Sequence, residues 1–144
     1  PGRQDPAERI QELRQLCWQV AGVERQGPSL RQARIQVRAQ RQELEASPLL
    51  AASAALEPGH GLELDSDQAS SLEDWQELYQ RLVVAERLIE AAAFREESRG
   101  GHYRTDAPSP QPFWQRHTLQ QRGCGISTAP VPGEAARVPA PGNR

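Results

Sequence analysis

Apolar residues recur every three or four positions along three stretches of the chain, which is the spacing of one buried face of an α-helix. In the first stretch, Asp5 can cap a helix whose first position is Pro6, and Gly27-Pro28 can end it. The pattern predicts an amphipathic helix with one buried stripe, formed by Ile10, Leu13, Leu16, Cys17, Val20 and Val23 and widened by Trp18 and Ala21.

The second stretch predicts a helix with a narrower apolar face. Ser29 can cap it, and Ser47-Pro48 breaks it. Its other positions are mostly polar, so it needs partners to bury its face. Residues 49–56 predict one or two more helical turns, and residues 57–69, which mix Gly, Asp and Ser without a period, indicate a linker. The apolar face consists of Leu30, Ala33, Val37 and Leu44.

The third stretch carries the strongest helical pattern in the chain. Ser70 or Ser71 can cap it, and Gly100-Gly101 can stop it. Three amphipathic helices with short or medium connections predict an all-α fold, an antiparallel three-helix bundle over residues 5–106. The stripe of the third helix consists of Leu72, Trp75, Leu78, Tyr79, Leu82, Val83, Ala85, Leu88, Ile89, Ala92 and Ala93.

The texture of the sequence changes after Asp106, because most of the 12 prolines lie beyond it. We expect an ordered extension over residues 107–122, where Phe113 and Trp114 can pack. Residues 123–144 predict an irregular Pro/Gly-rich C-terminal tail. We expect this tail to be disordered, since it buries too little apolar surface to offset the loss of chain entropy.

Composition narrows the classes of protein. Hydrophobic residues are 37% and aromatic residues 5% of the 144, so the core must be small and largely aliphatic, as in a helical bundle. All 17 basic residues are arginine, but the net charge is -2, so we expect no nucleic-acid partner. No stretch reaches the roughly 18 uninterrupted apolar residues of a membrane helix, and we expect no membrane span.

The start of the chain and its two cysteines bear on where the protein works. The chain begins Pro1-Gly2-Arg3 and contains no Met, which predicts a fragment or a processed product. Cys17 lies on an apolar helix face and Cys124 in a Gly-rich stretch. We expect two free thiols rather than a disulfide, as in a reducing compartment, and therefore a cytoplasmic protein.

Several common binding and catalytic motifs are missing from the sequence. No Gly-x-Gly-x-x-Gly follows a strand pattern, so we expect no dinucleotide site in this chain. His60, His102 and His117 are far apart and lack metal-ligand spacing, so we expect no metal site. No Ser/His/Asp set suggests a triad, and we assign no catalytic residue.

Charged residues concentrate in residues 96–106, at the predicted end of the third helix. Arginines can form forked pairs with carboxylates, and a histidine can titrate near neutral pH. Two interpretations are open: an ordinary solvated helix end with incidental ion pairs, or a polar seam at an interface with another domain. The candidate interface residues are Glu97, Ser98, Arg99, Gly100, His102, Tyr103, Arg104 and Asp106.

Three aromatic residues on the predicted helices also have two interpretations. Trp18, Trp75 and Tyr79 can stack against a ligand or pack in the core. Their helical spacing and the large area that aromatic side chains bury favour the core.

The concentrated motif resembles one known family. The C-terminal domain of the succinate dehydrogenase/fumarate reductase flavoprotein family is similar to the run Glu97-Ser98-Arg99-Gly100-Gly101-His102-Tyr103-Arg104-Thr105-Asp106, followed by Pro108 and Trp114-Gln115-Arg116-His117-Thr118-Leu119. Its opening helix is similar to Leu16-Cys17-Trp18-Gln19-Val20-Ala21-Gly22-Val23-Glu24-Arg25, with Gly27 and Leu30 after it. The resemblance covers about residues 8–120.

The resemblance implies a parent enzyme with FAD, in which this chain is a helical accessory domain that is not catalytic alone. Thr105, where the family's dehydrogenases usually carry Glu, favours the oxidase branch, which converts L-aspartate to iminoaspartate in the first step of de novo NAD biosynthesis. The family's flavin-binding and catalytic segments have no counterpart here. We therefore carry over no catalytic or cofactor-binding residue, and we expect the flavin-binding domain of the same parent chain as partner.

Two alternatives stay open. One is the C-terminal domain of a succinate dehydrogenase or fumarate reductase flavoprotein subunit, with the same polar seam near an iron-sulfur subunit. The other is a stand-alone helical interaction module, which would need no flavin domain at all.

Overall fold

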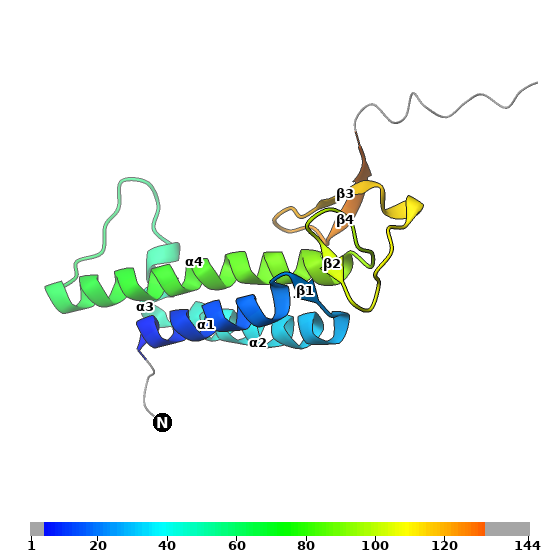
Figure 1. Ribbon diagram of the computed structural model, residues 1–144. Coiled ribbons are helices and arrows are strands. Elements are labelled where there is room, and N and C mark those ends of the chain that lie inside the picture. The colour runs from blue at the N-terminus through cyan, green and yellow to red at the C-terminus, as the bar shows by residue number, and fades with distance from the viewer. Residues whose placement is uncertain (1–4, 132–144) are drawn as a thin grey trace, which may run out of the picture.

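The structure is a computed structural model that describes residues 5–131, and four α-helices make up most of this part of the chain. Helices α1 (Pro6–Ala21) and α2 (Gly27–Glu45) lie along the 29-residue helix α4 (Ser66–Phe94) (Figure 1). The short helix α3 (Pro48–Ala54), which packs against α2 and α4, provides the further helical turns expected after the second helix. None of the described helices is long and apolar enough to span a membrane.

Two small strand pairs accompany the helices. Strand β1 (Glu24–Arg25) pairs in parallel with β2 (Tyr103–Arg104), and β3 (Arg116–Leu119) pairs antiparallel with β4 (Ser127–Pro130). A 3₁₀ turn, η1 (Pro112–Trp114), precedes β3. The chain is therefore mostly helical but not purely all-α, which corrects the expected fold class. Strands of two to four residues are too short to leave a periodic pattern in the sequence.

The region after residue 122 holds more structure than the sequence predicts. Strand β4 lies within the predicted disordered tail, and its register with β3 runs from Arg116 opposite Pro130 to Leu119 opposite Ser127. Such a pair is held by backbone hydrogen bonds, which the apolar content of a sequence does not report. The rest of the predicted tail, residues 132–144, lies outside the described residues.

Capping interactions set the start of α4 earlier than the apolar pattern suggests. The carboxylate of Asp65 accepts a hydrogen bond from the amide of Gln68 at 2.8 Å, and the Gln68 side chain accepts one from the amide of Asp65 at 3.2 Å. This capping box starts the helix at Ser66, so the predicted start at Ser70 or Ser71 is wrong and the linker is shorter. The first turn of α4 is polar, so it lengthens the helix without adding to the apolar pattern from which the start was predicted.

The other two long helices begin close to their predicted positions. Asp5 caps α1 as expected, accepting a hydrogen bond from the amide of Ala7 at 3.1 Å. Helix α2 begins at Gly27 rather than after Ser29, with Gln26 at its N-cap and no side-chain cap. The missing cap on α2 is replaced by a carboxylate from a distant part of the chain, described below.

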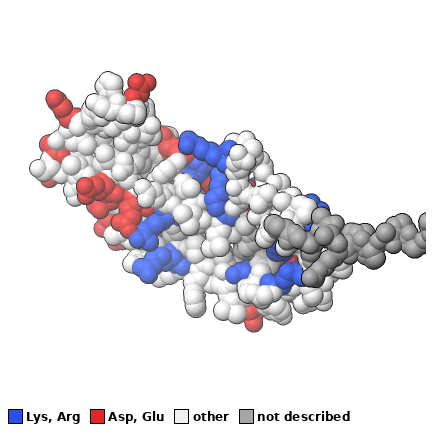
Figure 2. Space-filling model, turned by 90° about the horizontal axis from the view of Figure 1, so that it is seen from above, with Lys and Arg blue, Asp and Glu red and all other residues white. Residues whose placement is uncertain are grey.

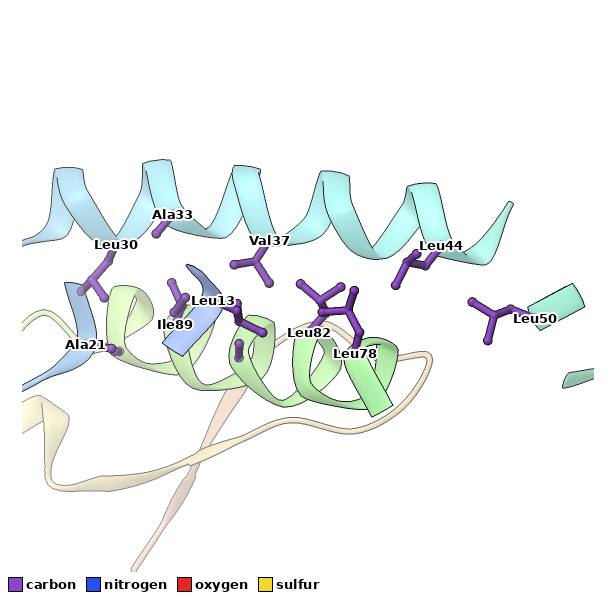
Figure 3. Packing of buried hydrophobic residues seen from close by; sticks show 12 residues of the cluster. Leu13, Ala21, Leu30, Ala33, Val37, Leu44, Leu50, Leu78, Leu82 and Ile89 are labelled. Atoms are coloured by element: carbon purple, nitrogen blue, oxygen red, sulfur yellow. The ribbon is translucent and has the colours of Figure 1, made fainter. Parts of the chain in front are cut away.

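The core lies mainly between α2 and α4, and α1 closes one side of it. Figure 3 shows Leu30 and Val37 of α2 pointing toward Leu82 and Ile89 of α4, and all four side chains are fully buried. Burying one such side chain contributes about 1.5–3 kcal/mol. The full cluster of buried apolar residues is Leu13, Ala21, Leu30, Ala33, Val37, Leu44, Leu50, Leu78, Leu82, Ala85, Ile89 and Ala92.

The prediction that Trp18, Trp75 and Tyr79 pack in the core is confirmed for two of them and wrong for the third. Trp75 and Tyr79 on α4 pack against the core and are partly buried. Trp18 on α1 is 77% exposed, so its assignment to the core is wrong. With about 100° of rotation per residue, Trp18 lies about 140° around α1 from Leu13, away from the face that packs on α4. Val23, which follows α1 and was expected on its stripe, is equally exposed.

Candidate functional site

A compact polar cluster follows the C-terminal end of α4, and we call residues 95–106 the charged turn. Helix α4 ends at Phe94, before the glycine pair that the sequence marks as its stop. Strand β2 at the end of the charged turn pairs with β1, which connects α1 to α2. The charged turn therefore joins the start of α2 to the end of α4.

Arg104 is the centre of this cluster and is only 2% exposed. Its Nε and Nη2 atoms donate to the two carboxylate oxygens of Asp106 at 2.9 and 2.6 Å, a forked pair of the kind predicted. Its Nη1 donates to the carbonyl oxygens of Ala93 and Arg95 at 3.1 and 3.2 Å. These carbonyls lack partners inside α4, so Arg104 both caps the helix end and offsets its partial negative charge.

Asp106 caps the N-terminal end of helix α2. Its Oδ2 accepts a hydrogen bond from the amide of Gly27 at 3.1 Å, at the N-terminal end of α2. The hydrogen bond from Arg104 and the amide of Gly27 favour the charged carboxylate and lower the pKa of Asp106 from 3.8 to about 2. One ion pair thus caps the end of α4 with its cation and the start of α2 with its anion.

The glycine at position 27 is required by this ion pair. A Cβ atom built on Gly27 would lie 2.3 Å from Arg104 Nη2 and 2.8 Å from Asp106 Oδ2. Both distances are shorter than any van der Waals contact, and both atoms are fixed by their own hydrogen bonds. The absence of a side chain at position 27 therefore lets the forked pair reach the helix.

Glu97 is fully buried and holds the second centre of the cluster. Its carboxylate accepts from Arg99 Nε and Nη2 at 3.0 and 3.1 Å, from the amide of Gln111 at 2.8 Å, and from Arg95. Burial alone would raise the pKa of Glu97, but these hydrogen bonds outweigh it and keep the pKa below its usual value. Glu97 is therefore an ionised internal anchor that joins the charged turn to the extension.

Ser98 and the glycine pair fix the path of the backbone between these two centres. The Oγ of Ser98 accepts from the amide of Arg104 at 2.8 Å and lies 2.8 Å from the carbonyl oxygen of Ala107, to which it donates. Arg99 and His102 exchange two backbone hydrogen bonds of 2.8 and 3.1 Å across Gly100-Gly101. Gly100 has a φ of +58°, the left-handed region that favours glycine, so the reversal needs this residue.

His102 connects β1 to the end of α4 through its two ring nitrogens. Nδ1 lies 2.8 Å from Arg25 Nη1, and Nε2 lies 3.1 Å from the carbonyl oxygen of Arg95. A guanidinium only donates and a carbonyl only accepts, so the ring must be neutral with its proton on Nε2. Burial first, and then the charges of Arg25, Arg104 and Arg95, lower the pKa of His102, against the opposing effect of the Arg95 carbonyl.

Two arginines next to the charged cluster, Arg95 and Arg25, make contacts that the sequence does not predict. Arg95 donates to the carbonyl oxygen of Trp114 at 2.8 Å and lies 5.5 Å above the Trp114 ring. That ring packs edge-on against Phe94 at 5.2 Å. Arg25 donates to the carbonyl oxygen of Ala21 at the end of α1, at 3.1 Å. A lone arginine after a helix leaves no local signal for such distant partners.

The predicted interface residues are thus brought together, but they differ in access. Glu97, Ser98 and Arg104 are buried inside this chain, His102 is half-buried, and the other four are exposed. The buried members make the internal network described above. The exposed members, which can reach another surface, are Arg99, Gly100, Tyr103 and Asp106. A role at a domain interface stays a prediction.

The cluster does not fit a cofactor site. Within residues 5–131, no group of three His, Cys, Asp or Glu side chains could hold a metal ion. A flavin dinucleotide needs backbone N–H groups at a glycine-rich turn that follows a strand. The glycine pair of the charged turn follows a helix, and the amides of Arg99 and His102 that flank it bond each other's carbonyls. The charged turn therefore lacks the strand-to-glycine turn by which a dinucleotide is usually bound.

Charge is unevenly distributed along the molecule. Between Arg41 and Arg81 the sequence holds no arginine or lysine, and this segment carries the linker and the start of α4. Figure 2 shows acidic side chains gathered toward that end, with arginines over the middle and the opposite end. A partner that meets both ends therefore meets surfaces of opposite sign.

Comparison with known proteins identifies relatives of this chain. Residues 61–141 match the family model described as fumarate reductase flavoprotein C-term. The L-aspartate oxidase of Nostoc sp. is 38% identical over 113 residues, which are 78% of this chain and 20% of that protein. The L-aspartate oxidase of Synechocystis sp. is 38% identical over 120 residues, which are 75% of this chain and 20% of that protein.

A third relative belongs to another enzyme. One subunit of the fumarate reductase (CoM/CoB) of Methanothermobacter marburgensis is 43% identical over 53 residues, which are 37% of this chain and 10% of that protein. No solved structure gives a significant match. The chain spans about a fifth of the length of the two oxidases that it matches.

Proposed function

Because this chain belongs to the family of fumarate reductase flavoprotein C-terminal domains, we propose that it is the C-terminal helical domain of an FAD-dependent L-aspartate oxidase. Such an enzyme oxidises L-aspartate to iminoaspartate, the first step of de novo NAD biosynthesis, in the cytoplasm. The observation that carries the proposal is the similarity to two L-aspartate oxidases over three quarters of the chain or more. The domain itself would be an antiparallel three-helix bundle of α1, α2 and α4.

The domain supports the enzyme by packing against its flavin-binding domain and takes no part in the chemistry. Charged side chains that could bind a substrate are instead used within the chain, as for Arg104 with Asp106 and Glu97 with Arg99. These pairs make the charged turn rigid, and a rigid turn presents Tyr103 and Arg99 at a fixed position. We propose that this face is the polar seam toward the flavin-binding domain.

Exposed apolar residues give the same proposal a second support. Val84 and Leu88 on α4 and Cys17 on α1 line a groove between the two helices, with Val84 68% exposed and Leu88 50% exposed. An exposed apolar groove of this kind marks an interaction site, and it fits a domain that packs against a larger enzyme.

The alternative is the C-terminal domain of a succinate dehydrogenase or fumarate reductase flavoprotein subunit, which would work beside an iron-sulfur subunit. The similarity to a fumarate reductase favours it, but over only 53 residues. The two proposals differ in the substrate of the complete enzyme, so an assay of that enzyme separates them.

The test is to express the complete reading frame that contains this segment and to assay the purified protein. We expect bound FAD and formation of hydrogen peroxide that depends on L-aspartate. Oxidation of succinate or reduction of fumarate, without oxidation of L-aspartate and with an iron-sulfur subunit that co-purifies, would support the alternative. A reading frame that encodes no flavin-binding domain would contradict both and would support the stand-alone interaction module.

The 144-residue chain provides the matching control. We expect it to bind no FAD, as measured by flavin fluorescence, and to form no hydrogen peroxide with L-aspartate. Tight FAD binding or turnover by this chain alone would overturn its role as an accessory domain.

A further inference from the structure

His102 occupies an unusual position for a histidine, because arginines face it from every element around it. Arg25 from β1 lies 2.8 Å from Nδ1, Arg104 comes from β2, and Arg95 comes from the segment after α4. The nearby carboxylates belong to other pairs: Asp106 bonds Arg104, and Glu97 bonds Arg95 and Arg99. No carboxylate among the described residues is hydrogen-bonded to the ring of His102.

The two ring nitrogens connect parts of the chain that are far apart in sequence. Through Nδ1, the ring holds Arg25, which also donates to the carbonyl oxygen of Ala21 and so caps the end of α1. Through Nε2, the ring donates to the carbonyl of Arg95 at the end of α4. The neutral imidazole therefore links the ends of two helices, and its contact with Arg25 Nη1 persists only while Nδ1 is an acceptor.

We propose that His102 is a pH-sensitive clamp whose protonation on Nδ1 releases Arg25 and loosens the pairing of β1 with β2. Protonation turns the acceptor into a donor and places a positive charge 2.8 Å from the guanidinium of Arg25. The two groups must then separate. The contacts between β1 and the charged turn are then weakened. Among them is the 3.0 Å hydrogen bond from the amide of Thr105 to the carbonyl of Arg25.

The direction of the pH effect follows from the same geometry. The folded state favours neutral His102, since burial and three arginines lower its pKa, so the unfolded state binds the proton more readily. The clamp is complete above the ordinary histidine pKa of about 6.5 and is lost below it, as the pH falls through the lowered pKa of the folded state. The ordinary pKa of histidine lies closer to neutral than the pKa of Asp106, which is about 2, so the two groups titrate in different pH ranges.

The experiment measures amide hydrogen exchange of Thr105 in the 144-residue chain at about pH 7.5 and about pH 5, corrected for intrinsic exchange. We expect its protection to fall about tenfold at the lower pH, as for the loss of one hydrogen bond to a charged group. In His102→Gln, the side chain stays polar but does not titrate, and we expect equal protection of Thr105 at both pH values. The matched control His117→Gln, at an exposed histidine, should behave like the unaltered chain.

Two results would overturn the clamp: equal protection of Thr105 at both pH values in the unaltered chain, or the same fall in His102→Gln. If His102→Gln does not fold, the proposal can be tested on the imidazole ring of the unaltered chain. Nitrogen NMR of the unaltered chain should show the proton of His102 on Nε2 above about pH 7. A proton on Nδ1 under those conditions would contradict the contact with Arg25 and with it the proposal.

Discussion

The aliphatic core between α2 and α4 and the charged turn beyond α4 bury their central side chains almost equally, by opposite means. Leu82 is fully buried and needs only neighbours of suitable shape. Arg104 is 2% exposed and makes four side-chain hydrogen bonds to named atoms. An apolar core loses stability in proportion to the volume removed, whereas a buried ion depends on all of its partners at once. The same chain therefore contains one region that tolerates gradual change and one that does not.

The largest effect is expected where the charged turn loses its central cation. Arg104→Met would leave Asp106 without its forked partner and the carbonyl of Ala93 without its side-chain donor. We expect a loss of about 4 kcal/mol in the free energy of unfolding, measured by urea denaturation. Arg104→Lys, which retains the charge but not the fork, should lose less. A loss below about 1 kcal/mol for Arg104→Met would show that the network does not stabilise the fold.

A matching truncation in the aliphatic core should have a somewhat smaller effect. Leu82→Ala removes a fully buried side chain and leaves a cavity, so we expect a loss of about 3 kcal/mol by the same measurement. The control is Leu88→Ala on the same helix, where the side chain is 50% exposed and the loss should be about 1 kcal/mol or less. Equal losses at both positions would contradict the assignment of the core.

The carboxylate of Asp106 should contribute to the pH dependence of the free energy of unfolding. The folded pKa of Asp106, about 2, lies below its ordinary value of 3.8, so its contribution is complete above 3.8 and is lost as the pH falls toward 2. Asp106 is 36% exposed, so we expect only about 1 kcal/mol after screening by water. In Asp106→Asn this part of the acid destabilisation should disappear, as measured by unfolding at pH values from about 6 to about 2.5. An unchanged pH profile would contradict the role of the pair.

The smallest effect is expected at a large aromatic residue that belongs to neither region. Trp18→Ser removes an exposed side chain, so the free energy of unfolding of this chain should change by less than about 0.5 kcal/mol. Trp75→Ser, at a partly buried position that packs against the core, should cost more. If Trp18→Ser destabilised the isolated chain as much as Trp75→Ser, the exposed position of Trp18 would be wrong.

The aliphatic region could be predicted from the sequence, and the reason is its periodicity. Leu30, Val37, Leu82 and Ile89 fall on helical stripes, and each is buried where the stripe predicts. The same method fails at Trp18. The residue next to a stripe position is rotated by about 100° around the helix, so its side chain leaves the buried face. It also fails at the start of α4, where a polar capping box extends the helix beyond its apolar pattern.

The position of the charged turn could be predicted from the sequence, but its hydrogen-bond partners could not. Its density of charge marked residues 96–106, but the partners that explain it, Gly27, Arg25 and Gln111, come from other parts of the chain. Hydrogen bonds to backbone atoms, such as those from Arg104 to Ala93, are independent of the identity of the residue that accepts them. Such contacts depend on how the elements pack, so a pattern of side chains cannot report them.

Gly27 illustrates a consequence for how this sequence can change over generations. Position 27 can gain a side chain only after the arginine and aspartate that occupy its space have been replaced. A variant that changes position 27 first meets a clash, and one that changes Arg104 first meets an unpaired carboxylate. The three positions therefore form a set whose order of replacement is restricted, although the chain separates the first from the others by more than seventy residues.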